Sequence, residues 1–356
     1  MRLALLLVGF GHVATRFVQL LAESRHALAA LDVEPVIVGI TTRQHGGTVD
    51  AAGLDAVRIA HLLDGGGTLG PTSTAAALEW FARRDAADAG EIEARVLVET
   101  TTLDVRSGEP ALSHVRRAMA GGAHVITANK GPVAFAWAAL AREAAARDLS
   151  FLFEGAVMDG IPIFSLVRET MPAVTVHGFR GVVNSTTNFM LSAMEEGRPF
   201  EAALAEMQAA GVAEADPSLD LDGWDAAAKA AALANVLLFA ETTPLAVARE
   251  GLVTATAARA RAALQAGRRL KLVASAEGRG PGARVRVALE ELPANDPLAV
   301  LDGQANAIEL DTTPLGRIVI TQRDGGMEKT AYALLADLVT GARRVRRAQS
   351  LGADEE

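Results

Sequence analysis

The alanine-rich segment GWDAAAKAAALANVL, residues 223–237, carries two charged side chains whose spacing suits acid–base chemistry. Asp225 and Lys229 lie four positions apart, so a helix places them on one face. The surrounding residues are mostly alanine and leucine, and a helix that is apolar on nearly every side is typical of a protein interior. A buried lysine is costly unless it is paired or takes part in function. The alternative interpretation is an ordinary surface ion pair.

A run of carboxylates precedes this lysine. Its members are Glu214, Asp216, Asp220, Asp222 and Asp225. So many acids favour recognition of an amine, a metal ion or both. The run does not fit a calcium-binding EF-hand, because no glycine occupies the required sixth position of the loop. A solvated acidic loop is the alternative, although the run leads directly into the apolar helix.

Two further segments concentrate polar side chains beside apolar runs. Lys130 lies in TANKG at the carboxyl end of an expected strand, where open α/β sheets bind ligands; a lysine that caps a loop is the alternative. In GVVNSTTNFML, residues 181–191, polar side chains suit a small polar substrate and equally suit an ordinary helix N-cap. These side chains are Asn184, Ser185, Thr186 and Thr187.

The segment LALLLVGFGHVA predicts a strand, a glycine turn and the start of a helix. In a dinucleotide-binding turn, Gly9 permits the tight turn, Gly11 lets the backbone approach a pyrophosphate, and Ala14 is the third small residue. The helix N-terminus then offers N–H donors to the phosphates. A glycine turn without a ligand is the alternative.

The end of the next strand indicates which dinucleotide binds. An acidic residue there would hold the ribose 2′-hydroxyl of NAD, but the strand ends in GITTR without an acid. Arg43 could bind a 2′-phosphate instead. The pattern therefore favours NADP(H) and does not exclude NAD(H); a solvated arginine is the competing interpretation.

The segment FEGAVMDGIPIF, residues 153–164, interrupts an apolar run with glycine and proline, which indicates a forced backbone shape. Such loops can present carbonyl oxygens to a hard cation. A purely structural turn explains the pattern equally well.

Strands and helices alternate in the first part of the chain, which predicts an α/β fold with a doubly wound parallel sheet. Residues 44–75 are expected to form a long loop with short elements. The expected strands are LALLLVG, EPVIVGITTR, ARVLVETTT and HVITANKG.

The pattern changes near residue 150 and predicts an α+β second domain. Its expected strands are LSFLFEGAV, TVHGFRGVVN, ARVRVALEEL and GRIVITQ, with helices near 186–197, 199–211, 223–241 and 254–267. The last helix, MEKTAYALLADLVTGARRV, is expected to pack back onto the first domain. The predicted limits are 1–150 for the nucleotide-binding domain, 151–310 for the second domain and 311–356 for the returning segment.

Composition excludes several classes of function. The net charge of −9 and the 4% of aromatic residues argue against nucleic-acid binding. Without cysteine, the chain has no disulfide, thiolate nucleophile or cysteine-ligated zinc. The short apolar start leads into the glycine turn and not into a cleavage site, and no apolar stretch is long enough to span a membrane. We therefore expect a cytoplasmic protein.

At these residues the chain resembles homoserine dehydrogenase. The resemblance covers most of the length and is carried by GFGHVA, ETTTLD, VITANKG, EGAVMDGIPIF, GVVNSTTNFML, AEADPSLDLDGWDAAAK and GGMEKTAYALLADL. It implies a Rossmann-type domain followed by an α+β catalytic and dimerisation domain, and a homodimer. It also implies interconversion of aspartate 4-semialdehyde and homoserine with NAD(P)H, in the pathway to threonine and methionine.

The resemblance also implies site residues. Lys130 and Lys229 are the expected acid–base lysines. Substrate contacts are expected from Glu214, Asp220, Asp225, Ser185 and Thr186. Cofactor contacts are expected, together with Arg43, from Gly9, Phe10, Gly11, His12, Val13, Thr100, Thr101, Lys130, Gly326 and Thr330. A monovalent cation, sodium or potassium, is the candidate ligand of Glu154, Val157, Asp159 and Ile161, mainly through backbone carbonyls.

Two positions depart from the family pattern. Ser185 stands where the usual sequence Asn-Gly-Thr has glycine, and Asp159 replaces a glycine of the cation loop. A regulatory ACT domain or an aspartokinase domain, which many members carry, is not expected. The alternatives are another two-domain NAD(P)-dependent amino-acid dehydrogenase and a non-catalytic NADP-binding protein.

Overall fold

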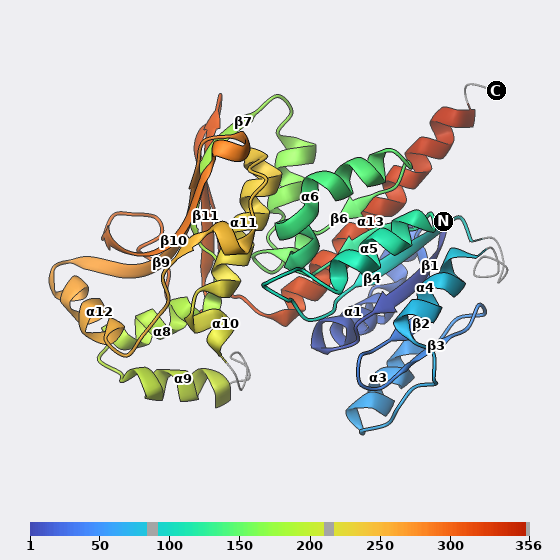
Figure 1. The fold of residues 1–356 in the computed structure, drawn as a ribbon, viewed down its shortest axis with the longest axis horizontal. Coiled ribbons are helices and arrows are strands. Elements are labelled where there is room, and N and C mark those ends of the chain that lie inside the picture. Colours follow the sequence, from blue (N-terminus) through green and yellow to red (C-terminus); the bar gives the residue numbers. More distant parts are fainter. Residues whose placement is uncertain (84–91, 210–216, 354–356) are drawn as a thin grey trace.

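The first sheet has six strands in the order β3-β2-β1-β4-β5-β6 (Figure 1). The structure is a computed structural model, and it describes residues 1–83, 92–209 and 217–353. All neighbours are parallel except β3, which runs antiparallel to β2. The strands are β1 (Arg2–Val8), β2 (Glu34–Thr41), β3 (Gly47–Val49), β4 (Ala94–Glu99), β5 (His124–Thr127) and β6 (Phe151–Leu152). The predicted doubly wound α/β sheet is confirmed.

Both faces of this sheet are covered, which explains the uninterrupted apolar sequence of β1. Leu3, Leu5 and Leu7 face α1 (His12–Glu23) and α13 (Met327–Ala353). Leu6 and its same-face neighbours pack against the opposite layer of helices. That layer comprises α4 (Thr74–Ala82), α5 (Ala111–Ala120) and α6 (Lys130–Ala145). Shorter helices α2 (Arg25–Ala30) and α3 (Ala56–Asp64) accompany β2, and α3 with β3 accounts for the short elements expected within residues 44–75.

The second sheet has the order β12-β11-β7-β9-β10-β8 and is antiparallel except where β8 meets β10. Its strands are β7 (Thr175–Val182), β8 (Ala248–Arg249), β9 (Arg268–Glu277), β10 (Arg284–Pro293), β11 (Asn306–Thr313) and β12 (Gly316–Gln322). The strands β8, β9 and β11 were not predicted.

One strand assignment was wrong. The segment LSFLFEGAV was expected in the second sheet, but its strand β6 pairs in parallel with β5 at the edge of the first sheet. An apolar run indicates burial without indicating its partner strand, which is why the sequence did not separate the two possibilities.

Four helices near the second sheet occur close to the expected positions: α8 (Ser185–Glu195), α9 (Phe200–Ala209), α11 (Trp224–Leu238) and α12 (Thr256–Gln265). The short helices α7 (Ile163–Ser165) and α10 (Ser218–Leu221) were not predicted. Short 3-10 helices cover Glu154–Ala156, Pro244–Ala246 and Gly280–Gly282, and a π-helix covers Leu166–Thr170.

Helix α11 joins the two halves of the molecule, because it packs on the second sheet and also against α6 (Figure 1). The Asn235 side chain of α11 is buried and donates to the carbonyls of Val133 and Ala134 in α6, at 3.2 and 3.1 Å. Next to these carbonyls the backbone of α6 is kinked at Ala136. Asn235 therefore supplies hydrogen-bond donors to the backbone of α6 beside its kink.

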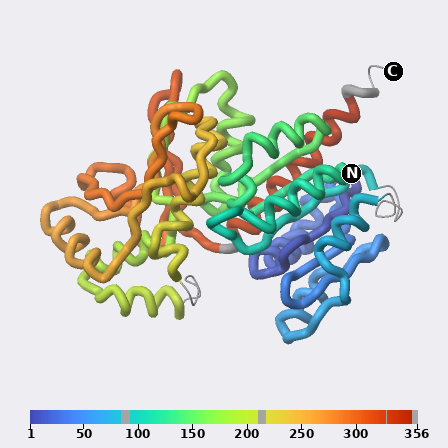
Figure 2. Tube along the Cα trace, viewed as in Figure 1, coloured from blue at the N-terminus to red at the C-terminus, as the bar shows by residue number. Residues whose placement is uncertain are grey.

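The final helix α13 returns to the first sheet and packs along α1 (Figure 2). The expected return of this helix is confirmed, whereas the division at residues 150 and 310 stays a prediction. Within the described ranges, no helix combines the length and apolar character needed to cross a membrane.

Candidate active site

Two lysines from different helices meet on one carboxylate. Lys130 begins α6, and its Nζ lies 3.1 Å from Oδ1 of Asp225. Lys229, one turn after Asp225 on α11, places its Nζ 3.2 Å from Oδ2 of the same residue. All three side chains are at most about one-fifth exposed. The expected pairing of Asp225 with Lys229 is therefore present, and Lys130 joins it from the other half of the molecule.

The charges of this array reinforce one another. Burial alone would raise the pKa of Asp225, but Lys130 and Lys229 hold it well below its usual value of 3.8. Burial alone would lower the pKa of Lys229, but Asp225 and then Asp159 raise it above its usual value. Lys229 is consequently an ammonium group at neutral pH. It is able to donate a proton or to stabilise a developing oxyanion.

Asn184 holds the array in place. Its side-chain oxygen accepts a hydrogen bond from the Thr187 amide and caps α8, so the N-cap interpretation of this segment is confirmed. Its amide nitrogen donates to Asp220 at 2.7 Å and to Asp225 at 2.8 Å. The Nζ of Lys229 also donates to the Val183 carbonyl at 2.7 Å. The sequence indicated the cap but not these two contacts, because Asp220 and Asp225 are distant along the chain.

Asp220 reaches the array because the chain turns sharply between α10 and α11. Gly223 caps α11 in a left-handed conformation, and a side chain there would collide with the Glu250 carbonyl. Burial and the negative charge of Asp225 raise the pKa of Asp220 above its usual value. Glu214 lies outside the described residues.

Ser185 and Thr186 start α8 beside these acids. The hydroxyl of Ser185 accepts a hydrogen bond from the Asn306 side chain at 2.9 Å. Thr186 is buried and lies close enough to Asp220 to lower the pKa of that carboxyl, against the larger effect of burial. Both residues thus border the lysine array.

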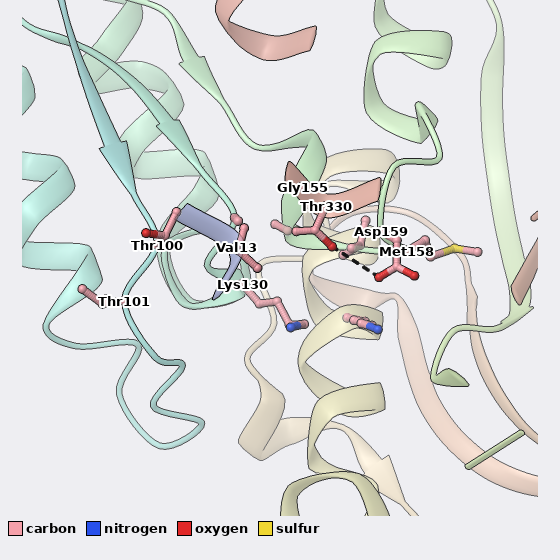
Figure 3. A pocket seen from close by; sticks show the side chains of 12 residues that line it. Val13, Thr100, Thr101, Lys130, Gly155, Met158, Asp159 and Thr330 are labelled. Carbon is pink, nitrogen blue, oxygen red and sulfur yellow. Dashed lines mark hydrogen bonds between the residues drawn. The ribbon is translucent and has the colours of Figure 1, made fainter. Parts of the chain in front are cut away.

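A cavity of about 220 Å³ connects the array to the first sheet (Figure 3). Lys130 and Asp159 extend into the same space from different elements, and Thr100 and Thr101 border it on the side of β4. It is lined by Val13, Thr100, Thr101, Ala128, Lys130, Gly155, Ala156, Val157, Met158, Asp159, Lys229 and Thr330. Among these, Ala128, Gly155, Ala156 and Met158 were not predicted. The other described residues that were predicted to contact the cofactor or the substrate are not part of this lining.

The glycine turn fits a dinucleotide. Gly9 has a φ of +86°, and a Cβ there would lie 2.7 Å from the backbone of Thr100 and Thr101. No atom occupies the space within 4 Å of a Cβ built at Gly11, and no side chain caps α1 at this residue. Free N–H groups at an uncrowded helix start suit a pyrophosphate. Phe10 and His12 lie in the same turn, outside the cavity lining.

Arg43 follows β2 and is exposed, outside the cavity lining. The end of β2 lies beside the glycine turn, because the Gly9 amide donates to the Thr41 carbonyl at 2.9 Å. Arg43 is therefore on the side of the turn where a ribose 2′-substituent is bound in this type of fold.

Glu99 is a buried carboxylate that sequence reasoning missed. Its oxygens accept hydrogen bonds from the hydroxyl and amide of Thr101 and from the hydroxyl of Thr127. Thr127 in turn accepts from the amide of Asn129, which caps α6 one residue before Lys130. Glu99 therefore links the threonines beside the cavity to the helix that carries Lys130. Its position at the carboxyl end of β4 was the available signal.

The loop of the candidate cation site is tightly built. The carboxylate of Glu154 accepts from the amides of Phe164 and Ser165, at 2.7 and 2.8 Å, so both of its oxygens are engaged in holding the loop. The carbonyl of Ile161 already accepts from Ile163 at 2.8 Å. Among the described residues, no cluster of three acidic or histidine side chains offers an alternative metal site.

Comparisons with known proteins agree on one family. A family model described as homoserine dehydrogenase matches residues 162–339, half of the chain. An NAD(+)-dependent homoserine dehydrogenase from Pseudomonas canavaninivorans is 34% identical over 339 residues, covering 94% of this chain and 95% of that protein. The homoserine dehydrogenase from Methanocaldococcus jannaschii is 31% identical over 337 residues, covering 94% of this chain and 97% of its own.

Solved structures give the same result. A putative homoserine dehydrogenase from Archaeoglobus fulgidus matches with a TM-score of 0.81 at 27% identity, covering 96% of this chain and 98% of its own. A homoserine dehydrogenase from Thiobacillus denitrificans matches with a TM-score of 0.79 at 30% identity, covering 98% of this chain and 74% of its own. These matches do not favour either alternative, a dehydrogenase of another kind or a non-catalytic NADP-binding protein. With two relatives above 30% identity along nearly its whole length, this chain belongs to the homoserine dehydrogenase family.

Proposed function

We propose that this protein is a homoserine dehydrogenase that interconverts L-aspartate 4-semialdehyde and L-homoserine. Membership of the family makes it an NAD(P)-dependent oxidoreductase acting on a CH–OH group. The observation that carries the substrate assignment is the array of Lys130 and Lys229 on Asp225, at the wall of a cavity that reaches the nucleotide-binding turn.

The cofactor would be held at the glycine turn. Gly9 and Gly11 leave room for its pyrophosphate at the start of α1, and Thr100, Thr101 and Thr330 would flank its reactive end at the cavity. When bound in reduced form, it supplies the hydride for the aldehyde carbon.

The protein supplies the proton. An ammonium group has three N–H donors, and Lys229 uses one on Asp225 and one on the Val183 carbonyl. One donor is left for the carbonyl oxygen of the substrate, which becomes an alkoxide during reduction and takes a proton from Lys229. Lys130 directs its remaining donors at the same space and stabilises the same negative charge. In the reverse direction the lysine accepts the proton from the hydroxyl group.

The amino end of the substrate would lie toward the acids. Asp220 borders the array together with the hydroxyls of Ser185 and Thr186, and Glu214 is part of the same proposal. Asp225 has both oxygens occupied by lysines, which favours its role in orienting them over a direct contact with the substrate.

Oxidation of NADPH at 340 nm tests the proposed function. Purified protein should consume NADPH with L-aspartate 4-semialdehyde and should reduce NADP with L-homoserine. Related aldehydes and keto acids serve as comparison substrates. A clearly faster reaction with one of these comparison substrates would refute the assignment.

We also propose that NADP(H) is preferred over NAD(H), with Arg43 as the residue that binds the 2′-phosphate. The support is the absence of an acid at the end of β2, although one relative is named NAD(+)-dependent. Arg43→Ala should raise the KM for NADPH by about tenfold or more, as expected for a lost charge-assisted hydrogen bond, and leave the KM for NADH nearly unchanged. Arg58→Ala, at an exposed arginine of α3, is the control. Equal or better turnover of the wild type with NADH would contradict the preference.

A monovalent cation is a further part of the proposal. The carbonyls of Glu154, Val157, Asp159 and Ile161 are the candidate ligands, in a loop whose backbone has positive φ angles at Met158 and Asp159. Replacing sodium and potassium by tetramethylammonium at constant ionic strength should then lower activity, and an unchanged rate would exclude a functional cation.

We further propose a cytoplasmic homodimer. The edge strand β12 of the second sheet exposes Val319, and Leu315 in the adjoining turn is also exposed, which is typical of a surface that another chain can cover. Light scattering should give twice the mass of one chain, and the mass of a single chain at micromolar concentration would contradict the proposal.

A further inference from the structure

The two departures from the family pattern, Asp159 and Ser185, lie at the same place in the structure. A Cβ built on Gly325 would be 3.0 Å from the Ser185 hydroxyl and 3.1 Å from Oδ2 of Asp159. The turn before α13 is therefore enclosed by these two side chains. Nothing in the local sequence indicates this, because the three residues are far apart along the chain.

Asp159 binds this turn directly. Its Oδ2 accepts a hydrogen bond from the amide of Gly326 at 3.0 Å, and its Oδ1 lies 3.5 Å from the hydroxyl of Thr330 in the first turn of α13 (Figure 3). Gly326 has a φ of +131°, a conformation that other residues rarely adopt, so the turn favours glycine at this position. The carboxylate thus fixes a turn that has no side chain of its own to anchor it.

The backbone conformation at Asp159 is also unusual. Met158 and Asp159 have φ angles of +49° and +54°, the left-handed region that favours glycine. Aspartate tolerates this region better than most residues, and here the conformation directs its carboxylate at the turn. A strained backbone at a cavity wall indicates a functional demand on the position.

The first turn of α13 is held from two sides. On the side of α1, Arg16 forms an ion pair of 2.8 Å with Glu328. On the side of the cavity, the loop packs so closely that a Cβ on Gly160 would lie 2.7 Å from the Lys329 carbonyl. Asp159 adds the polar contact on this second side. Thr330, which lines the cavity next to Lys229, is therefore held by contacts on two sides of α13.

We propose that Asp159 is a positioning residue for the cofactor: its carboxylate fastens the Gly325–Gly326 turn and the first turn of α13 to the wall of the catalytic cavity. This inference rests on the proposed function, because Thr330 and Gly326 are expected to contact the cofactor of the proposed dehydrogenase. A turn that is ordered before the cofactor arrives reduces the entropy cost of binding. An acid in place of the family's glycine would serve this purpose without touching substrate.

Two substitutions separate the hydrogen bond from the charge. Asp159→Gly removes the carboxylate and relieves the backbone. Asp159→Asn keeps an acceptor oxygen for the Gly326 amide and tolerates the same φ, but removes the charge. Asp148→Gly is the matched control, because Asp148 is an exposed aspartate with a φ of +54° that follows α6.

Hydrogen exchange of the free protein and NADPH titration provide the readouts. In Asp159→Gly the amides of residues 325–330 should exchange about tenfold faster, and the Kd for NADPH should rise about tenfold, with a smaller change in kcat. Asp159→Asn should restore both values to within about twofold of the wild type. The Asp148→Gly control should match the wild type.

Either of two results would overturn the proposal: unchanged exchange and Kd in Asp159→Gly, or an Asp159→Asn variant that behaves like Asp159→Gly. The second result would assign the effect to the negative charge near Lys229. Neither readout requires turnover, so a wild-type protein inactive on aspartate 4-semialdehyde would refute the proposed function and still leave the role of Asp159 decided.

Discussion

Lys229→Ala is expected to lose turnover by roughly 10²–10⁴-fold while NADPH binding survives, because removing a proton-transfer group has an effect of this size. Lys229 lies at the cavity wall with one ammonium donor left for the substrate, and Asp225 keeps it protonated. Lys229→Met should lose as much, although it keeps most of the side-chain volume in the packed helix.

Steady-state kinetics with aspartate 4-semialdehyde and a fluorescence titration with NADPH measure the two quantities separately. Thermal unfolding of the alanine and methionine variants shows whether a loss of activity reflects a loss of fold. A kcat within about tenfold of the wild type in a folded Lys229→Met variant would disprove the role of this lysine as proton donor.

Asp225→Asn is expected to have an effect of similar size, since it leaves two ammonium groups facing each other without their shared carboxylate. Without Asp225 the pKa of Lys229 falls. As the pH rises, the ammonium form of Lys229, which donates the proton, is then lost at a lower pH than in the wild type. The alkaline limb of the pH profile for aldehyde reduction should therefore move toward lower pH, and the rate at neutral pH should fall by about 10²-fold or more.

The same substitution should change stability. Removing one partner of a buried charge cluster lowers the free energy of unfolding by about 3–5 kcal/mol. The pKa of Asp225 in the folded protein lies below its usual 3.8, so its stabilising effect is fully present above that value and is lost as the pH falls below it. Urea unfolding from pH 7 down to pH 3 should therefore show a weaker acid dependence for Asp225→Asn than for the wild type.

Asp222→Asn is the matched control for both measurements, because Asp222 is an exposed aspartate close to Asp225 in the sequence. It should leave the pH profile and the unfolding free energy nearly unchanged. An Asp225→Asn enzyme with the wild-type alkaline limb would show that this carboxylate does not keep Lys229 charged.

The parts of the fold that were predictable depend on short-range patterns. The strand, turn and helix around Gly9 follow from a continuous apolar run and two spaced glycines. Lys229 was a candidate because a cation among alanines is costly to bury unless it is paired or takes part in function. In both cases the residues that decide the structure are neighbours in the sequence.

The parts that were missed depend on partners that are distant along the chain. Strand β6 could not be assigned to a sheet until its pairing with β5 was known. Glu99 acts through Thr127 and Asn184 acts through Asp220 and Asp225, and neither contact leaves a periodic signal. Asp159 was identified as a departure from the family pattern, but its contact with Gly326 depends on where α13 returns.

The buried side chain of Asn235 has a consequence for how the enzyme can move. It fastens α11 to α6, and these are the helices that carry Lys229 and Lys130. These contacts restrain movement of the two helices relative to each other, so we expect the spacing of the two ammonium groups to be set before any ligand enters. We therefore expect substrate and cofactor to enter and leave through movements of the surrounding loops, while the two lysines keep their positions.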